Sequence, residues 1–160
     1  MVDTVLTHLD DSGQVRMVDV GDKAATSRTA VAQGRVRMGE KAFGLLEAAE
    51  NAKGDVLNTA RLAGIMAAKR CAELIPLCHT LPLSAVHIDF DLVPEHHHVN
   101  ITATCRTIYR TGVEMEAMTA CSVAALTIYD MCKAADKGIV IEDLKLRSKT
   151  GGKSGDWQND

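Results

Sequence analysis

The chain has 160 residues, of which 46% are hydrophobic and only 3% aromatic, and its formal charge at pH 7 is −3. This length suits a single domain that buries its own core, and no apolar run reaches the length of a membrane span. The small negative charge excludes a general attraction to nucleic acid or to an anionic membrane, and few aromatic rings are present to stack on bases.

The first fifty residues predict an arm, two strands and a helix. Residues 1–14 are polar and are expected to form a flexible N-terminal arm without the apolar core of a signal peptide. Residues 15–20 predict a short strand. Residues 30–38 alternate between apolar and polar side chains, which favours a second strand. Residues 40–49 have helical composition.

A second helix is predicted over residues 56–74, because Asp55 directly before it can accept hydrogen bonds from the amides of the first turn. Ala60, Gly64 and Ala68 recur in this helix every four residues. Small side chains on one helix face allow another backbone to approach closely. We therefore expect close packing on this face, with part of it covered by a second subunit.

The middle of the chain predicts a hairpin. Residues 75–82 contain Pro76 and Pro82, which exclude a regular helix there. Residues 85–93 and 99–106 both alternate between apolar and polar side chains and are separated by a short turn. These two segments are expected to pair as antiparallel strands.

A long helix is predicted next, over residues 111–133, followed by a last strand over residues 139–146 and a glycine-rich end. The order strand, helices, hairpin, helix, strand is a β-α-β-β-α-β pattern. It predicts an α+β, ferredoxin-like domain in which helices pack on one face of an antiparallel sheet. We place a single catalytic domain at residues 15–156 and a C-terminal tail at residues 157–160.

The cysteine pattern favours reduced thiols in a cytoplasmic protein. The number of cysteines is odd, they include no C-x-x-C pair, and the chain is not small and loop-rich, so a disulfide framework is not expected. The five residues are Cys71, Cys78, Cys105, Cys121 and Cys132.

The long helix is apolar on nearly all sides, which is typical of a buried helix. Successive residues are about 100° apart, so Glu116, Thr119, Asp130 and Lys133 share one flank, while Glu114 lies nearly opposite. Buried charges are costly unless they are paired or used. We therefore interpret this flank as the wall of a pocket, and the excess apolar surface as an interface with another subunit.

Asp130 and Lys133 allow two interpretations. Three residues apart on a helix, they can form an ordinary ion pair near the helix C-terminus. Alternatively they are an acid–base couple, in which burial lowers the pKa of the lysine so that it acts near neutrality. Lys53, beside a glycine in a predicted loop, is either a solvated lysine or a site residue.

The segment around His79 and the glycine-rich end allow further alternatives. Cys78 and His79 could be half of a zinc site, but no second close pair exists, so a positioned imidazole is preferred and no metal is predicted. Residues 149–155 lack the first glycine and the following helix of a P-loop. Their amides and two lysines suit a phosphate, and a frayed basic tail is an equal alternative.

Several motifs taken together resemble the MoaC family over about residues 15–156. One departure is Thr80, where the family usually has proline. The motifs are MVDV at 17–20, KGD at 53–55, AKR at 68–70, IPLCH at 75–79, TGVEMEA at 111–117, ALTIYDMCK at 125–133 and SKTGGKSG at 148–155.

The resemblance implies a phosphorus–oxygen lyase of molybdenum cofactor biosynthesis. Such an enzyme converts a cyclised dihydroguanosine triphosphate, made from GTP, to cyclic pyranopterin monophosphate and releases pyrophosphate. The resemblance also implies a homohexamer, built as a trimer of dimers, with active sites at the dimer interface. No nucleic acid, membrane or cofactor is expected, and the sequence leaves open whether Mg²⁺ accompanies the triphosphate.

Matching the motifs residue by residue assigns catalytic roles to Asp130, Lys133 and Lys53. A ligand-sensing module at a subunit interface, or a metal-dependent phosphohydrolase that uses His79, is left open by the fold alone. The resemblance assigns substrate contacts to Leu77, Cys78, His79, Glu114, Met115 and Glu116, and contacts with the triphosphate to Arg28, Lys69 and Lys149.

Overall fold

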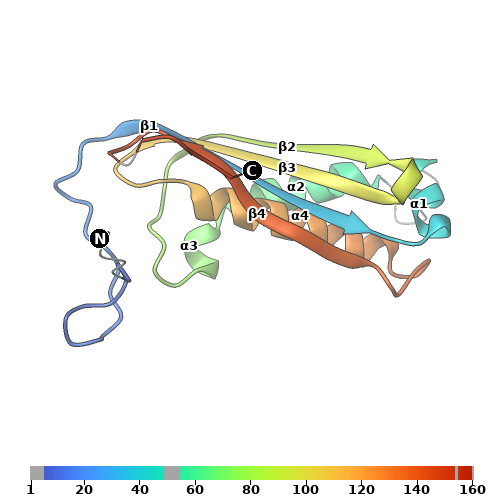
Figure 1. Ribbon diagram of the computed structural model, residues 1–160, viewed down its shortest axis with the longest axis horizontal. Helices are drawn as coiled ribbons and strands as arrows, with labels where there is room; N and C mark the ends of the chain where they lie inside the picture. The colour runs from blue at the N-terminus through green and yellow to red at the C-terminus, as the bar shows by residue number, and fades with distance from the viewer. Residues whose placement is uncertain (1–5, 49–54, 154, 160) are drawn as a thin grey trace.

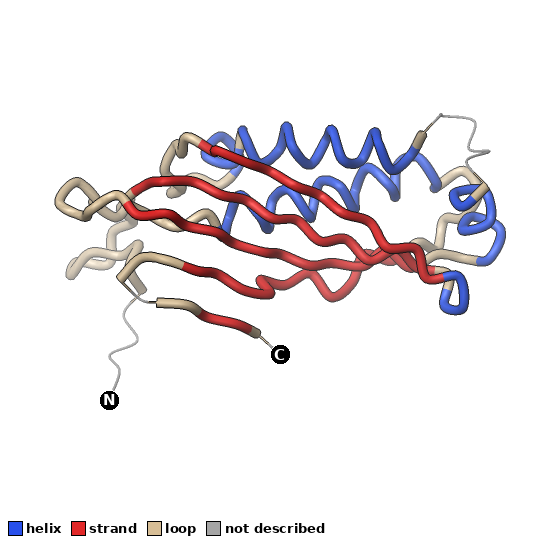
Figure 2. The backbone as a smooth tube through the Cα atoms, turned by 90° about the horizontal axis from the view of Figure 1, so that it is seen from above, coloured by secondary structure: helices blue, strands red, loops and turns tan. Residues whose placement is uncertain are grey.

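The structure is a computed structural model that describes residues 6–48, 55–153 and 155–159. It confirms the α+β class: helices pack on one face of an antiparallel sheet (Figures 1 and 2). The elements are β1 (Thr26–Arg37), α1 (Glu40–Glu47), α2 (Val56–Lys69), α3 (Cys71–Leu74), β2 (Leu83–Val93), the 3₁₀ helix η1 (Pro94–His96), β3 (His98–Tyr109), α4 (Glu114–Cys132), β4 (Val140–Thr150) and β5 (Trp157–Gln158).

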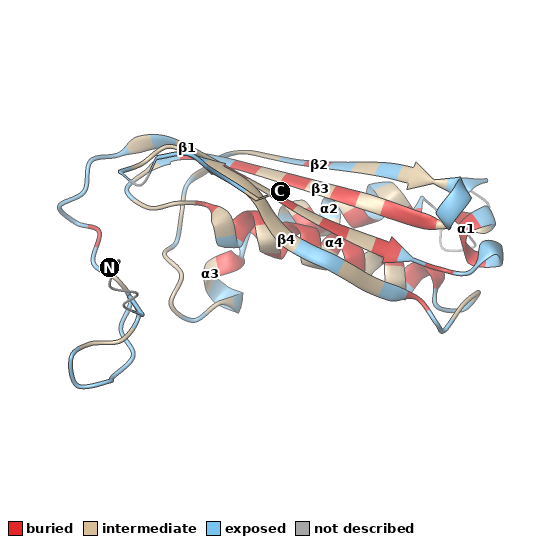
Figure 3. Cartoon of the chain, viewed as in Figure 1, coloured by how far each residue is buried: buried red, intermediate tan, exposed pale blue. Residues whose placement is uncertain are grey.

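The sheet order is β2-β3-β1-β4-β5, and its first four strands have the ferredoxin-like order. The central strand β1 pairs with β3 on one side and β4 on the other. Buried residues alternate with more exposed ones along β1 and β3 (Figure 3). The buried ones include Ala30, Ala32 and Val36 of β1 and Ile101 and Ala103 of β3. Because side chains alternate along a strand, these small residues all face the helices.

The helices α2 and α4 lie side by side on the same face of the sheet, and they approach one another very closely. A Cβ atom built on Gly64 would lie 2.8 Å from the carbonyl oxygen of Ala120 and would overlap the side chain of Ile88. The predicted close approach at the small-residue face is therefore confirmed. Ala60 and Ala68 are buried with Gly64 inside the same subunit, so the expectation that a second subunit covers this face was wrong.

Three predicted elements differ from the structure. Residues 15–20 do not form a strand; Val15 makes an isolated bridge to Leu9 inside the arm. The helix predicted over 56–74 is interrupted at Arg70, whose φ of −110° and ψ of 14° separate α2 from α3. The glycine-rich end turns back through left-handed Gly151 and Gly152, so that β5 pairs with β4.

The start of α2 and the extent of α4 agree more closely with the elements predicted from the sequence. Asp55 accepts a hydrogen bond from the backbone N–H of Asn58 at 3.0 Å, which is the predicted N-cap. The helix α4 is shorter than predicted and spans 19 residues. None of the helices in the described part of the chain is both long and apolar enough to cross a bilayer.

Replacement of Gly64 by alanine should destabilise the protein by about 1–3 kcal/mol, because the added methyl group overpacks the contact between α2 and α4. The matched control is Gly44→Ala in α1, where an added Cβ meets nothing within 4 Å. That change should stabilise the protein by up to about 1 kcal/mol, because alanine favours a helix. Urea unfolding followed by circular dichroism at one protein concentration measures both. Equal effects of the two substitutions would contradict the packing described here.

Candidate functional site

The N-terminal end of α4 borders two adjoining hollows. The larger, of about 1040 Å³, we call the basic groove, because Lys23, Arg28, Arg110, Lys149 and Lys153 line it together. The smaller, of about 400 Å³, we call the Glu116 pocket; it is lined by residues that include His79, Met115 and Glu116. Lys23, Thr111, Gly112 and Glu114 border both hollows, so one ligand can occupy them together.

Three strands and the end of the chain position the basic groove. The Arg28 guanidinium on β1 donates from Nε to the carbonyl of Tyr109, 3.1 Å away at the end of β3. Lys149 on β4 forms an ion pair of 2.9 Å with Glu114, the first residue of α4. A side chain at Gly152 would overlap the Arg28 guanidinium, so glycine there lets the backbone lie beside this cation. Cations and close backbone amides are suited to binding phosphates.

The arm and the segment between α3 and β2 position His79. Nε2 of His79 lies 2.7 Å from the carbonyl oxygen of Val18. Because a carbonyl only accepts, the ring must carry its proton on Nε2, and in the neutral ring Nδ1 is then an acceptor. Leu77 and Cys78, which precede His79, are half-buried. Burial raises the pKa of the Cys78 thiol, so this cysteine is held as a neutral group.

Glu116 is the most deeply buried carboxylate of the site, with 4% of its surface exposed. Burial raises its pKa above the ordinary range, and the nearby negative charge of Glu114 raises it further. Glu116 and Thr119 are both buried, as the helix pattern predicted. A carboxylate with a raised pKa at the wall of a pocket is suited to exchanging protons or accepting hydrogen bonds from a ligand.

Asp130 and Lys133 lie at the other end of α4. Their side chains form an ion pair of 2.5 Å and are 58% and 53% exposed. Of the two interpretations of this pair, the single subunit shows the ordinary ion pair, in which the hydrogen bond and charge of Asp130 raise the pKa of Lys133. The alternative, in which burial lowers the pKa of the lysine, is wrong for the single subunit. Fourteen residues of helix separate Asp130 from Glu116, which is about 21 Å at 1.5 Å per residue. The polar flank is therefore not one pocket wall within one subunit.

The remaining predicted residues have different positions. Lys53 lies outside the described residues. Lys69 is exposed at the end of α2 and borders a separate hollow of about 360 Å³. Leu81 borders both that hollow and the Glu116 pocket, which makes the two neighbours. The sequence analysis did not identify Lys23 and Arg110 as site residues. Lys23 follows the motif at 17–20 and Arg110 directly precedes the motif at 111–117, and this proximity was the signal that could have identified them.

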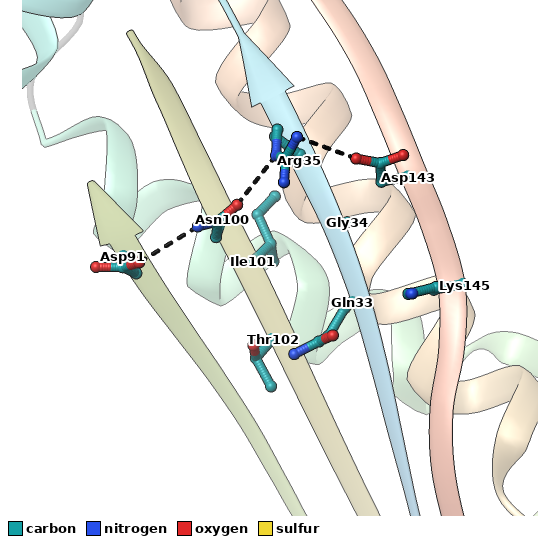
Figure 4. Close-up of a pocket in the computed structure, with 9 residues that line it drawn as sticks. All are labelled: Gln33, Gly34, Arg35, Asp91, Asn100, Ile101, Thr102, Asp143 and Lys145. Carbon is teal, nitrogen blue, oxygen red and sulfur yellow. Dashed lines mark hydrogen bonds and ion pairs between the residues drawn. The ribbon is translucent and has the colours of Figure 1, made fainter. Parts of the chain in front are cut away.

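A further hollow of about 480 Å³ lies on the sheet face opposite the helices (Figure 4). Asn100 accepts from Arg35 at 3.2 Å and donates to Asp91 at 3.3 Å, and Arg35 pairs with Asp143 at 3.1 Å. These groups satisfy one another across the strands. None of the predicted site residues lines this hollow, and we do not assign the site to it.

Among the residues that the structure describes, no three His, Cys, Asp or Glu side chains are grouped so that they could hold a metal ion. The histidine-rich hairpin turn brings His96 and His98 together with ring centroids 5.8 Å apart, which is a pair and not a three-ligand site.

Comparisons with known proteins add an independent line of evidence. A family model described as the MoaC family matches residues 17–152. The cyclic pyranopterin monophosphate synthase of Bordetella avium is 70% identical over 97% of this chain and 96% of its own. The proteins of the same name from Bordetella pertussis and Herpetosiphon aurantiacus are 69% and 60% identical, over 97% of this chain and 96% and 94% of theirs.

Replacement of Glu116 by glutamine should stabilise the protein more at pH 8 than at pH 5. Because folding raises the pKa of this carboxyl group, its ionisation costs more free energy in the folded protein than in the unfolded chain. Its destabilising effect therefore grows as the pH rises above the pKa that the group has in the unfolded chain. Thermal unfolding at the two pH values, at fixed protein concentration, measures the difference. The control is Glu73→Gln on the exposed side of α3, which should show the same small shift at both. A pH-independent gain for Glu116→Gln would contradict its raised pKa.

Proposed function

The chain belongs to the MoaC family, and from this we propose that it is a lyase of molybdenum cofactor biosynthesis, a cyclic pyranopterin monophosphate synthase. Its proposed substrate is the cyclised dihydroguanosine triphosphate made from GTP, and its products are cyclic pyranopterin monophosphate and pyrophosphate. The observation that carries this proposal is the meeting of a five-cation groove with a buried carboxylate and a fixed histidine at one helix end.

The basic groove is suited to the triphosphate. A cyclic phosphate forms when a sugar hydroxyl attacks the first phosphorus and pyrophosphate departs. Negative charge then grows on the leaving group, and positioned cations stabilise it. Arg28 and Lys149 are proposed to bind these phosphates, with Lys23, Arg110 and Lys153 on the same walls. A bound phosphate would also compete with Glu114 for Lys149, which forms an ion pair with that carboxylate.

The Glu116 pocket is suited to the base. A carboxylate accepts paired hydrogen bonds from the adjacent N–H groups of a guanine-derived ring. Glu116 presents such a group beside His79, while Met115 supplies apolar surface. The ring rearrangement requires several proton transfers, and we assign these to Asp130, Lys133 and Lys53 on the basis of the family motifs.

The distance along α4 supports a site that these two sets of residues form from different subunits. Asp130 and Lys133 of one chain lie about 21 Å and about 25 Å along the helix from its own Glu116, too far to share one small ligand. The helix layer also exposes large apolar side chains: Leu62 of α2 is 59% exposed and Leu126 of α4 is 57% exposed. We propose that a second copy covers this surface and brings its Asp130 and Lys133 to the first copy's Glu116 pocket. Three such dimers would form the hexamer.

The proposed enzyme is cytoplasmic and holds no resident metal, while Mg²⁺ would enter with the triphosphate as part of the substrate. Incubation with the cyclised triphosphate separates this proposal from a sensor, which would bind the compound unchanged. An enzyme would release pyrophosphate and form the cyclic phosphate. Loss of turnover in a chelator, restored by Zn²⁺ and not by Mg²⁺, would favour the metal-dependent phosphohydrolase.

Two inactive variants should complement one another when mixed. Lys133→Ala and Glu116→Gln each remove one half of the proposed shared site, so each alone should lose pyrophosphate release by a large factor. In a mixed dimer one site carries both changes and the other carries none. After random exchange in an equal mixture, about one site in four carries neither change. The mixture should therefore regain about a quarter of the wild-type activity.

The control is a mixture of Lys133→Ala with Asp130→Asn. Both changes affect the same half of the site, so every mixed site remains damaged and no recovery is expected. Full turnover by Lys133→Ala alone would remove the assignment of Lys133. Two inactive parents that exchange subunits without any recovery of activity would contradict a site shared between subunits.

A further inference from the structure

The N-terminal arm, taken here as residues 6–25 before β1, forms part of both hollows of the site. It extends beyond the end of the sheet where β1 begins (Figure 1). Lys23 lines both hollows, whereas His8 lines the Glu116 pocket and does not line the basic groove. The arm residues on the pocket are Thr7, His8, Val18, Val20 and Lys23.

Hydrogen bonds hold the outer part of the arm as a small hairpin. The Asp10 carboxylate accepts from the backbone N–H groups of Ser12 and Gln14, each at 2.9 Å, and from the Ser12 hydroxyl at 2.7 Å. The backbone N–H of Arg16 donates to the carbonyl oxygen of His8 at 2.8 Å. An aspartate that binds the amides following it in this way forms a local turn. His8 therefore has a defined position within the arm.

Two contacts attach the inner part of the arm to the rest of the subunit. Nε2 of His79 donates to the carbonyl oxygen of Val18 at 2.7 Å, and the Arg110 guanidinium donates to the carbonyl oxygen of Gly21. His79 lines the Glu116 pocket and Arg110 lines the basic groove. The residues that fasten the arm are thus residues of the site itself, so a bound ligand would lie against the arm.

The hairpin determines which nitrogen of His8 can accept a hydrogen bond from a ligand. Nδ1 lies 3.3 Å from the carbonyl oxygen of Arg16. Because a carbonyl only accepts, Nδ1 carries the proton, and Nε2 of the neutral ring is an acceptor. Nδ1 of His79 is an acceptor for the same reason, and Glu116 adds a carboxylate. Three separate segments therefore bring hydrogen-bond acceptors to one pocket, which suits a ring that carries several N–H groups.

We propose that the arm is a wall of the ligand site and that His8 is a binding residue, whose Nε2 accepts a hydrogen bond from an N–H group of a guanine-derived ring. The identity of this ring rests on the proposed function. The positions of His8 on the pocket and of Lys23 on both hollows do not depend on it. His8 should therefore contribute to binding of the base and not to binding of the phosphates.

The experiment uses GTP, which carries the base and the phosphates, and inorganic triphosphate, which carries the phosphates alone. Titration calorimetry gives the Kd of each for the full chain. His8→Ala should weaken GTP binding by roughly fivefold, as expected for loss of one hydrogen bond, and leave the Kd of triphosphate unchanged. His8→Gln, which keeps an acceptor at the far end of the side chain, should recover most of that loss. Lys23→Ala should weaken both ligands, because Lys23 lines both hollows.

Two further variants separate the position of His8 from a general effect of losing a histidine. His87 is exposed on β2 and lines neither hollow, so His87→Ala should change neither Kd. Asp10→Ala removes the acceptor that forms the turn in the hairpin. It should weaken GTP and not triphosphate, because His8 is then no longer held in place.

Equal affinity of the wild type and His8→Ala for GTP would overturn the inference. An equal loss of both ligands in His8→Ala would also overturn it, as would a wild type that binds no GTP. If GTP binding depends on His8 but the wild type releases no pyrophosphate from the cyclised triphosphate, the proposed reaction fails and the role of the arm stands.

Discussion

The contact between α2 and α4 at Gly64 is the constraint on which the site depends. It holds α4 as a straight rod of 19 residues beneath the sheet, with the Ala120 carbonyl against the α2 backbone. One end of this rod lies beside α3 and the arm, and the other lies beside α1, where Asp136 accepts from the Gly39 amide at 2.7 Å (Figure 1). The positions of Glu116 and Asp130 are therefore fixed relative to one another, and neither can reach the other by local movement.

This rigidity explains why one subunit carries two unlike ends. At the first end, burial raises the pKa of Glu116, the charge of Glu114 raises it further, and this carboxylate lies close to the basic groove. At the second end, an exposed aspartate and lysine form a pair that water surrounds in the isolated chain. Burial of this pair by another copy would lower the pKa of Lys133, because desolvation disfavours the charged form of a lysine. As long as it is exposed, the ion pair contributes little to the free energy of folding.

The sequence predicted the order of elements well, because period-two alternation and helix caps are local signals. Asp55 marked the start of α2, and the alternation over residues 99–106 marked β3. It failed at residues 15–20, where an alternating stretch has no neighbouring strand to pair with, and at Arg70, where tertiary packing interrupts a favourable helical composition. The expected burial of Lys133 was wrong for another reason. Helix periodicity predicts on which side of the helix a residue lies, whereas its exposure depends on what covers that side.

The site was predicted from motifs, and the structure adds how its members meet. Glu114, Glu116 and His79 come together with Arg28 and Lys149, which no spacing in the sequence reveals. Lys23 and Arg110 join them because the arm and the end of β3 converge on the same groove. Cys71 was visible only as one of five cysteines, since its contact with Thr119 arises from the packing of α3 against α4.

A crystal structure of the assembled protein with a non-reactive purine triphosphate would test the central claim most directly. The account predicts that the base contacts Glu116 of one copy while Lys133 of a neighbouring copy lies within hydrogen-bond reach of the same ligand. It also predicts that Lys133 of the copy whose Glu116 contacts the base stays about 25 Å from that Glu116. A ligand bound entirely by one copy, with every Lys133 remote from it, would contradict the account.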